Sequence, residues 1–213
     1  MFESGRTALA EPLSWKPRLT SLAFLVLFFL VSYNFANWFT SRRAHVPSIA
    51  FGWESRVPFL PWTILPYWSS DLLYAASISL CSTRRELDRH TKRLFAAQVI
   101  SILCFLVFPL RCIFERPETS GIFGWFFHVL LFFDMPFNQA PSLHISLVVI
   151  FWSFFSAHLN GLWWIAMRAW LVLVAISTMT TYQHQFIDLP TGVLAGFFVI
   201  AVFPDRTNAG RLP

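Results

Sequence analysis

The chain is poor in charged residues: Asp, Glu, Lys and Arg make up only 13% of its 213 residues. Soluble domains usually contain about 25% charged residues. In place of charge the chain is 56% hydrophobic, with 25 Phe and 10 Trp. A soluble globular domain is therefore a poor fit. The net charge of +5 is not accompanied by the pattern of aromatic and basic residues that binds nucleic acid. The low charge and high hydrophobicity together predict an integral membrane protein.

Cysteine is also scarce. Cys81, Cys104 and Cys112 are odd in number, lie in or beside apolar segments and lack metal-ligand spacing. We expect buried or free thiols with no functional role. The first apolar run is long and no small-residue cleavage site follows it, which argues against a secretory signal.

Long apolar stretches dominate the rest of the sequence, and a helix needs roughly 20 such residues to cross a bilayer. Six candidate spans are Leu19–Phe39, Trp62–Cys81, Leu94–Phe114, Pro141–His158, Leu162–Tyr182 and Ile187–Phe203. A shorter stretch, Gly121–Phe133, is predicted to lie in the membrane interface or against the bundle. The sequence thus predicts an all-α polytopic membrane helix bundle with about six transmembrane helices, forming a single domain over residues 1–213.

The distribution of Lys and Arg predicts the orientation. Ten of these residues fall in the two chain ends and in the loop after the second span, and five fall in the alternate loops. Because Lys and Arg favour the cytoplasmic side, both termini are predicted to be cytoplasmic in a cell (inner) membrane. Three polar stretches, "RCIFERPETSG", "PSLH" and "TYQHQFIDLP", would then meet on the non-cytoplasmic face.

The third polar stretch pairs a histidine with a carboxylate. His184 and Asp188 are four residues apart, so they could share one helix face. A carboxylate bonded to one imidazole nitrogen fixes the tautomer and leaves the other nitrogen free as base or nucleophile. Pro190 disfavours a helix that continues through it, so the helix is expected to begin near Ile187. The alternative is a capping Asp beside an unrelated His.

The second stretch has the features of a helix start. Pro141 suits a first helical turn, so Ser142 and the free amides beside it could form an anion site, with His144 close enough to donate a proton. An ordinary helix start is the alternative. In the first stretch, Arg111 and Arg116 could each grip two phosphate oxygens, or could simply extend toward lipid head groups. Together these groups suit phosphoryl transfer, which depends on positioning and charge stabilisation.

In their order along the chain, the three stretches resemble the motifs of the phosphatidic acid phosphatase type 2 superfamily of membrane lipid phosphatases and phosphotransferases. Its first block, Lys–six residues–Arg-Pro, is matched at its end by Arg116-Pro117, and its second, Pro-Ser-x-His, by residues 141–144. Its third, Ser-Arg–five residues–His–three residues–Asp, is matched by Ser177, His184 and Asp188. The resemblance covers roughly residues 94–203 and is greatest to the branch that contains inositol phosphorylceramide synthases. The block-one Lys is replaced by Pro109 and the block-three Arg by Thr178.

The resemblance implies a role for each matched residue. His184 would attack phosphorus to form a phosphohistidine, Asp188 would orient it, and His144 would protonate the leaving group and then activate the acceptor. Arg116 and Ser142 would bind phosphoryl oxygens, with Arg111 as a substitute cation. No metal or organic cofactor is implied. Water as acceptor would give a phosphatase acting on a lipid phosphate or diphosphate, which we favour slightly, and an alcohol would give a phosphotransferase.

Two other classes of function remain open from the residues. His144, His184 and Asp188 could form a two-His-one-carboxylate metal site. Alternatively, Asp71 within the second predicted span could belong to a transport path in a transporter or scaffold without enzymatic activity.

Overall fold

The computed structural model describes residues 13–205, and over this range the regular structure is entirely helical. The seven α-helices are α1 (Trp15–Ser41), α2 (Ile64–Ser79), α3 (Arg84–Val107), α4 (Gly121–Phe133), α5 (Leu143–His158), α6 (Gly161–Thr180) and α7 (Asp188–Val202). Two short 3-10 turns, η1 (Glu54–Arg56) and η2 (Pro61–Thr63), lie between α1 and α2. The predicted all-α class is confirmed for these residues.

Three helices are long and apolar enough to cross a membrane: α1 with 27 residues, α3 with 24 and α6 with 20. They support an integral membrane protein. The helices α2 and α5 have 16 residues each and α7 has 15. At 1.5 Å per residue such helices are about 24 Å long, against about 30 Å for the hydrocarbon core.

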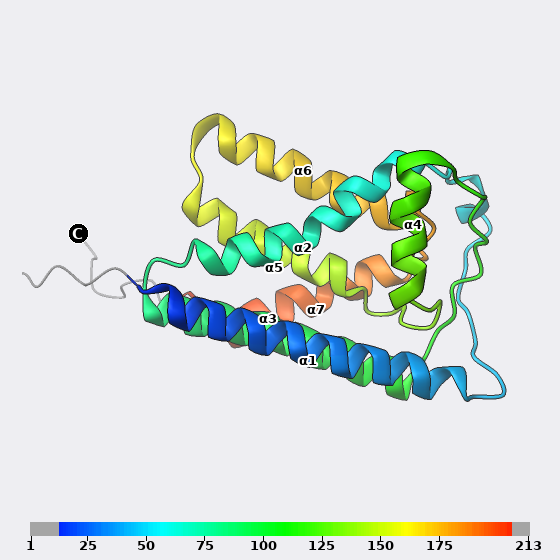
Figure 1. Ribbon diagram of the computed structural model, residues 1–213, viewed down its shortest axis with the longest axis horizontal. Helices are drawn as coiled ribbons and strands as arrows, with labels where there is room; N and C mark the ends of the chain where they lie inside the picture. Colours follow the sequence, from blue (N-terminus) through cyan, green and yellow to red (C-terminus); the bar gives the residue numbers. More distant parts are fainter. Residues whose placement is uncertain (1–12, 206–213) are drawn as a thin grey trace, which may run out of the picture.

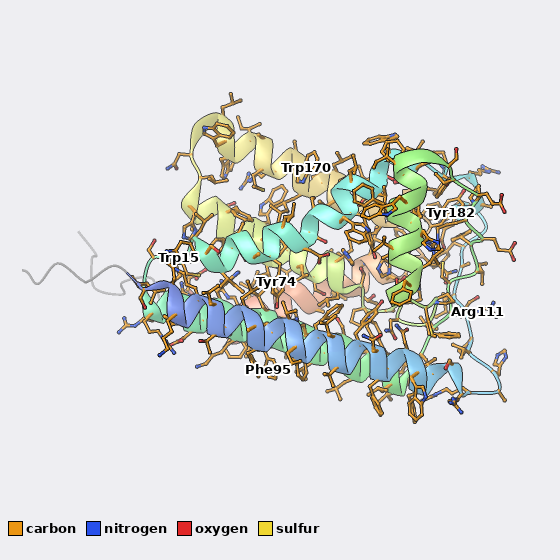
Figure 2. All side chains as sticks on the ribbon, in the orientation of Figure 1. Trp15, Tyr74, Phe95, Arg111, Trp170 and Tyr182 are labelled. Atoms are coloured by element: carbon orange, nitrogen blue, oxygen red, sulfur yellow. The ribbon has the colours of Figure 1, made fainter. Side chains whose placement is uncertain are left out.

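The outer surface is also typical of a membrane protein. Leu27 on α1, Trp163 on α6 and Phe197 on α7 are 64%, 77% and 60% exposed. Large apolar side chains cover the outside of the helices along their length, as Figure 2 shows. Water-soluble monomers rarely expose such extensive apolar surface, whereas a bilayer accommodates it.

The third predicted span, Leu94–Phe114, differs from the observed helix at both ends. The helix α3 begins ten residues earlier, at Arg84, where the Thr83 hydroxyl accepts a bond from the Glu86 amide. The Glu86 carboxylate in turn accepts from the Ser82 amide, so a capping box overrides the high charge of this segment. At the other end α3 stops at Val107, two residues before Pro109.

The helices other than α4 run roughly along the long axis of the molecule, and α4 crosses them at one end (Figure 1). The segments 42–63, 108–120, 134–142 and 181–187 gather at this same end, which we call the loop end. The helix α4 packs there on α2 and η2, with Phe127 against Ile64 and Tyr67. This position agrees with the predicted packing of residues 121–133 against the bundle.

The helix α5 lies at the centre of the bundle and packs on α2, α3, α6 and α7. Its buried side chains include Ile150, Phe151 and Phe154. Its contact with α7 is close because glycines occupy the facing positions, Gly192 and Gly196. The Ser146 hydroxyl also donates to the Gly192 carbonyl at 3.0 Å. This contact fixes the beginning of α5 against the beginning of α7.

Candidate active site

The three polar stretches singled out in the sequence all lie at the loop end. One lies between α3 and α4, one forms the start of α5, and one connects α6 to α7. They meet because α3 and α6 end at this side of the bundle, whereas α5 and α7 begin there.

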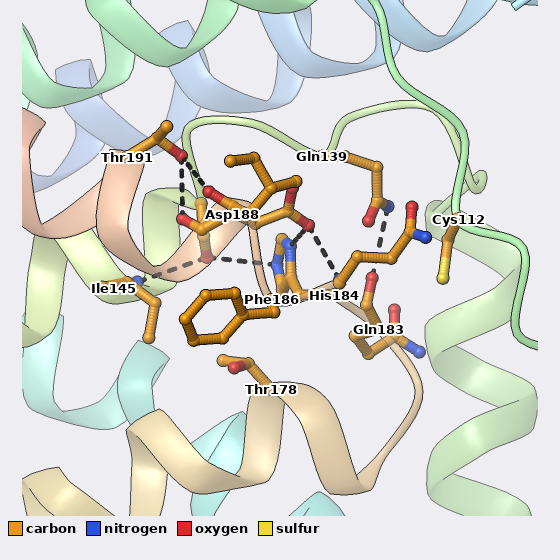
Figure 3. A network of polar contacts seen from close by, with 12 residues as sticks. Cys112, Gln139, Ile145, Thr178, Gln183, His184, Phe186, Asp188 and Thr191 are labelled. Carbon is orange, nitrogen blue, oxygen red and sulfur yellow. Dashed lines mark hydrogen bonds and ion pairs between the residues drawn. The ribbon is translucent and has the colours of Figure 1, made fainter. Parts of the chain in front are cut away.

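The centre of the candidate site is the His184–Asp188 pair. His184 Nδ1 lies 3.0 Å from Asp188 Oδ2, and both residues are buried (Figure 3). The same carboxylate oxygen accepts a bond from the Gln185 amide at 3.0 Å. The carboxylate therefore holds the Nδ1–H tautomer, which leaves Nε2 with a free lone pair.

The two residues of this pair are held by a turn rather than by a continuous helix. His184 lies in the loop after α6, where its amide and that of Gln183 both donate to the Thr178 carbonyl, at 3.0 and 3.2 Å. The helix α7 begins at Asp188, so Pro190 falls in its first turn, as predicted from the sequence. Thr178 contributes its backbone carbonyl to this turn and no positive charge.

Ser142 links the start of α5 to this pair. It is the N-cap of α5, and its hydroxyl accepts from the Ile145 amide and lies 3.3 Å from His184 Nε2. Its own amide donates to the Asp188 carbonyl at 3.2 Å. Pro141 precedes the cap, so its expected place within the first helical turn is wrong by two residues, because the Ser142 side chain supplies the cap.

His144 lies one residue into α5 and faces the same space as His184. The centroids of the two imidazoles are 6.1 Å apart. The His144 ring stacks on Tyr67 of α2 at a centroid distance of 4.1 Å. Both histidines line a small cavity of about 40 Å³, large enough for one or two waters. The other residues that line it are Phe29, Tyr33, Tyr67, Phe105, Asp134, Asn138, Gln139, Leu143 and Gln183.

The two arginines lie outside this cavity. Arg111 and Arg116 both line an adjoining open groove of about 830 Å³. Arg116 is half-buried, with its guanidinium 5.8 Å from the centre of the Phe127 ring. Arg111 is exposed, and its backbone amide donates to the Pro47 carbonyl. Arg116 is thus next to the site, whereas Arg111 is farther along the groove.

Gln183 connects Arg116 to the cavity. Its amide fits its neighbours when the oxygen accepts from Arg116 Nη1 at 3.0 Å and the nitrogen donates to Asp134 Oδ2 at 3.1 Å. Tyr33 of α1 donates to the other carboxylate oxygen, Oδ1, at 2.5 Å. Burial raises the pKa of Asp134, and the hydrogen bond from Tyr33 lowers it in part.

Reasoning from the sequence missed Asp134, Gln183, Tyr33, Tyr67 and Glu54. Glu54 is buried, and its two oxygens accept from the Phe51 and Phe186 amides at 2.7 Å each. It ties the segment before α2 to the turn that carries His184. A local signal was present for Asp134 and Glu54, since each is an isolated acid in an aromatic stretch, but no spacing rule joins either to its partner.

The metal-site and transport hypotheses depend on acidic residues and histidines. The described part of the chain contains no group of three or more His, Cys, Asp or Glu that could hold a metal ion. Asp71 is exposed on α2 and does not line the cavity of the two histidines. The three cysteines are free, as expected, and burial raises the pKa of Cys112 to about 11, which keeps it a thiol at neutral pH.

Comparison with known proteins gives no match: no family model, no curated protein and no solved structure is similar to this chain. The arrangement of its residues therefore supplies the argument for function.

Proposed function

We propose that this protein is a membrane-embedded phosphoesterase that hydrolyses a lipid phosphate or diphosphate through a phosphohistidine intermediate. The observation that carries the proposal is the buried contact between His184 Nδ1 and Asp188 Oδ2, with Nε2 turned toward the N-cap of α5. A buried imidazole held in this tautomer is a ready nucleophile.

The reaction has two steps. His184 Nε2 attacks phosphorus while the bond to the lipid oxygen breaks, and His144 gives its proton to the leaving oxygen. His144 then takes a proton from water, which attacks the phosphohistidine and releases phosphate. Ser142 and the free amides at the start of α5 stabilise the phosphoryl oxygens during both steps.

Arg116 would bind the phosphate from the groove side. Its guanidinium bonds to Gln183, the residue before the nucleophile, so it lies within reach of a group bound between groove and cavity. Arg111, farther along the groove, would attract the anionic head group and is expected to matter less.

In the membrane, six helices would span, with α2, α5 and α7 stopping short of one surface of the hydrocarbon core, and α4 would lie in the interface. The C-terminal ends of α1, α3 and α6, which lie at the site, would face the non-cytoplasmic side. The reason is that the basic loops gather at the opposite end. A lipid phosphate would then reach the groove from the head-group region of that leaflet.

Transfer to an alcohol is the second candidate for the same site. The open groove of about 830 Å³ beside the cavity supports it, because an acceptor needs room that water does not. The resemblance to the inositol phosphorylceramide synthase branch points in the same direction. The chemistry at His184 is the same, and the acceptor in the second step is the difference.

The test is phosphate release from lipid phosphates by the purified protein in detergent, with and without an alcohol acceptor. His184→Ala and His144→Ala should each abolish turnover at unchanged expression. His128→Ala, at an exposed position on α4, is the matched control and should retain it. Full activity in either site variant would refute the proposal, and inhibition by a chelator would favour a metal hydrolase. A transporter or scaffold would release no phosphate.

A further inference from the structure

Asp134 lies between the two spaces that a substrate would occupy. It directly follows α4 and lines both the cavity of His144 and His184 and the open groove of Arg111 and Arg116. A carboxylate at this point is unexpected in a site for an anion, because it repels the negative charge that the site should bind.

The hydrogen bonds around Asp134 define its charge. Arg116 can only donate, so the Gln183 oxygen must accept from it, and the Gln183 nitrogen is left to donate to Asp134. The Tyr33 hydroxyl donates to the other carboxylate oxygen. Both oxygens of Asp134 therefore act as acceptors, which describes the ionised form. Through Gln183, this negative charge is paired with Arg116.

The cavity itself has no compensating cation. None of the described residues that line it is Lys or Arg. Two positions that are Lys and Arg in the phosphatidic acid phosphatase type 2 motifs are Pro109 and Thr178 in this chain. Pro109 lines a separate apolar groove, and the Thr178 side chain donates to the Ala175 carbonyl. Besides the proton that His144 donates, the charged groups around the reacting atom are thus Arg116, Asp134 and Asp188, which together carry one negative charge.

We propose that Asp134 is a selectivity-determining residue that makes the site favour a singly charged phosphodiester over a doubly charged phosphomonoester. This inference rests on the phosphohistidine chemistry proposed for the same site, and it changes the preferred substrate from a lipid phosphate to a lipid phosphodiester. A phosphomonoester brings a second negative charge next to Asp134, and two like charges several Å apart in a partly buried site repel by enough to change affinity about tenfold or more.

The reaction of a diester is balanced in the same way as that of a monoester. His184 Nε2 forms a bond to phosphorus, one of the two ester P–O bonds breaks, and the leaving oxygen takes the proton from His144. The intermediate keeps the second ester group. Water or an alcohol then loses a proton to His144 and attacks phosphorus, and the bond between phosphorus and His184 Nε2 breaks. The product is a phosphomonoester or a new diester.

The experiment compares two lipids with identical acyl chains, dioleoyl phosphatidic acid as monoester and dioleoyl phosphatidylglycerol as diester, in mixed micelles at pH 8. The wild-type protein should show the higher kcat/KM for the diester. Asp134→Asn, which removes the charge and keeps the shape, should raise kcat/KM for the monoester about tenfold relative to the diester. Glu118→Gln makes the same change at an exposed loop position and should leave the ratio unchanged.

A wild-type preference for the monoester, or an unchanged ratio in Asp134→Asn, would overturn the role of Asp134 and leave the phosphohistidine mechanism intact. Turnover of neither lipid would refute the proposed function and this inference with it. If Asp134→Asn does not fold, inhibition of the wild-type protein decides: dimethyl phosphate, a single anion, should inhibit at a lower concentration than inorganic phosphate at pH 8. Stronger inhibition by inorganic phosphate would overturn the inference.

Discussion

The close contact between α5 and α7 can be tested by adding one methyl group, in Gly192→Ala. A Cβ built at Gly192 would lie 2.7 Å from the Ser142 carbonyl oxygen and 2.8 Å from Ile145 Cβ. Carbon atoms in good contact are about 3.5–4.0 Å apart, so the two helices must separate locally by about 0.7 Å or more. The backbone of Ser142 cannot rotate away as a flexible side chain could, and the whole start of α5 must therefore move.

The displacement lengthens the contact between the Ser142 hydroxyl and the His184 imidazole. Ser142 Oγ lies 3.3 Å from His184 Nε2, and a further shift of about 0.7 Å takes this contact beyond hydrogen-bond range. Overpacking of this kind typically costs about 1–3 kcal/mol, so the variant should still fold. A misplacement of about 1 Å in a catalytic arrangement can reduce the rate about 100-fold. We therefore expect phosphate release to fall at least tenfold, with a modest decrease in Tm.

Two other glycines separate loss of the site from loss of the fold. Gly196 lies one turn farther along α7, and its Cβ would meet Val149 Cβ at 2.7 Å and the Ser146 carbonyl at 3.0 Å. Gly196→Ala should lower Tm by a similar amount but reduce activity less, because it acts farther from His184. Gly52→Ala, with nothing within 4 Å of its Cβ, should change neither. Wild-type activity in Gly192→Ala, or equal inactivation by Gly196→Ala, would refute this reasoning.

Three further predictions concern charged groups. Asp188→Asn should keep the fold but lower turnover on the order of 10³-fold or more, because the amide no longer fixes the Nδ1–H tautomer of His184; single-turnover kinetics would measure the loss, and near-normal chemistry would contradict it. Glu54→Gln puts an NH₂ where two backbone amides need acceptors, so it should lower stability by about 1–3 kcal/mol, measured as Tm in detergent, whereas Glu118→Gln should not. Burial raises the pKa of Asp134, whose carboxyl faces Tyr33, Tyr67, Arg116 and His184, so the carboxylate gains a proton as pH falls through that value. The preference for the diester should therefore weaken between pH 8 and pH 5.5, and by more in the wild-type protein than in Asp134→Asn. In that variant only the lipid monoester changes its charge over this range. Parallel pH profiles of the two proteins would contradict the prediction.

The parts of the site that local rules govern could be predicted from the sequence. Pro190 marked the start of α7, and the four-residue spacing singled out His184 and Asp188, although a turn and not a shared helix face brings them together. The apolarity criterion failed where a cap was involved: the charged run 84–93 joined α3 because of the box formed by Thr83 and Glu86. Apolarity alone had placed this boundary ten residues too late.

The residues that surround the pair could not be predicted in the same way. Tyr33 meets Asp134 across 101 residues of chain, and Glu54 meets the Phe186 amide across 132. Such contacts leave no periodic pattern, because they depend on how separate helices pack. An isolated acid in an oily stretch indicates that a partner exists, and the fold is needed to identify it.

The shortness of α5 and α7 gives the site its depth in the proposed membrane arrangement. Both helices begin at the loop end and have 16 and 15 residues, about 24 Å, so they cannot extend across the full hydrocarbon core of about 30 Å. The helix α1, with 27 residues, is about 40 Å long and passes beyond their starts. In that arrangement Ser142 and Asp188 would lie below the level at which α1 leaves the membrane, with the segments of the loop end above them. A phosphate on a lipid resides near that level, so a short inward movement would bring it from the groove of Arg116 to His184 while its acyl chains stay among the helices. Lengthening α5 and α7 to span the bilayer fully would move the nucleophile out into water and away from the lipid.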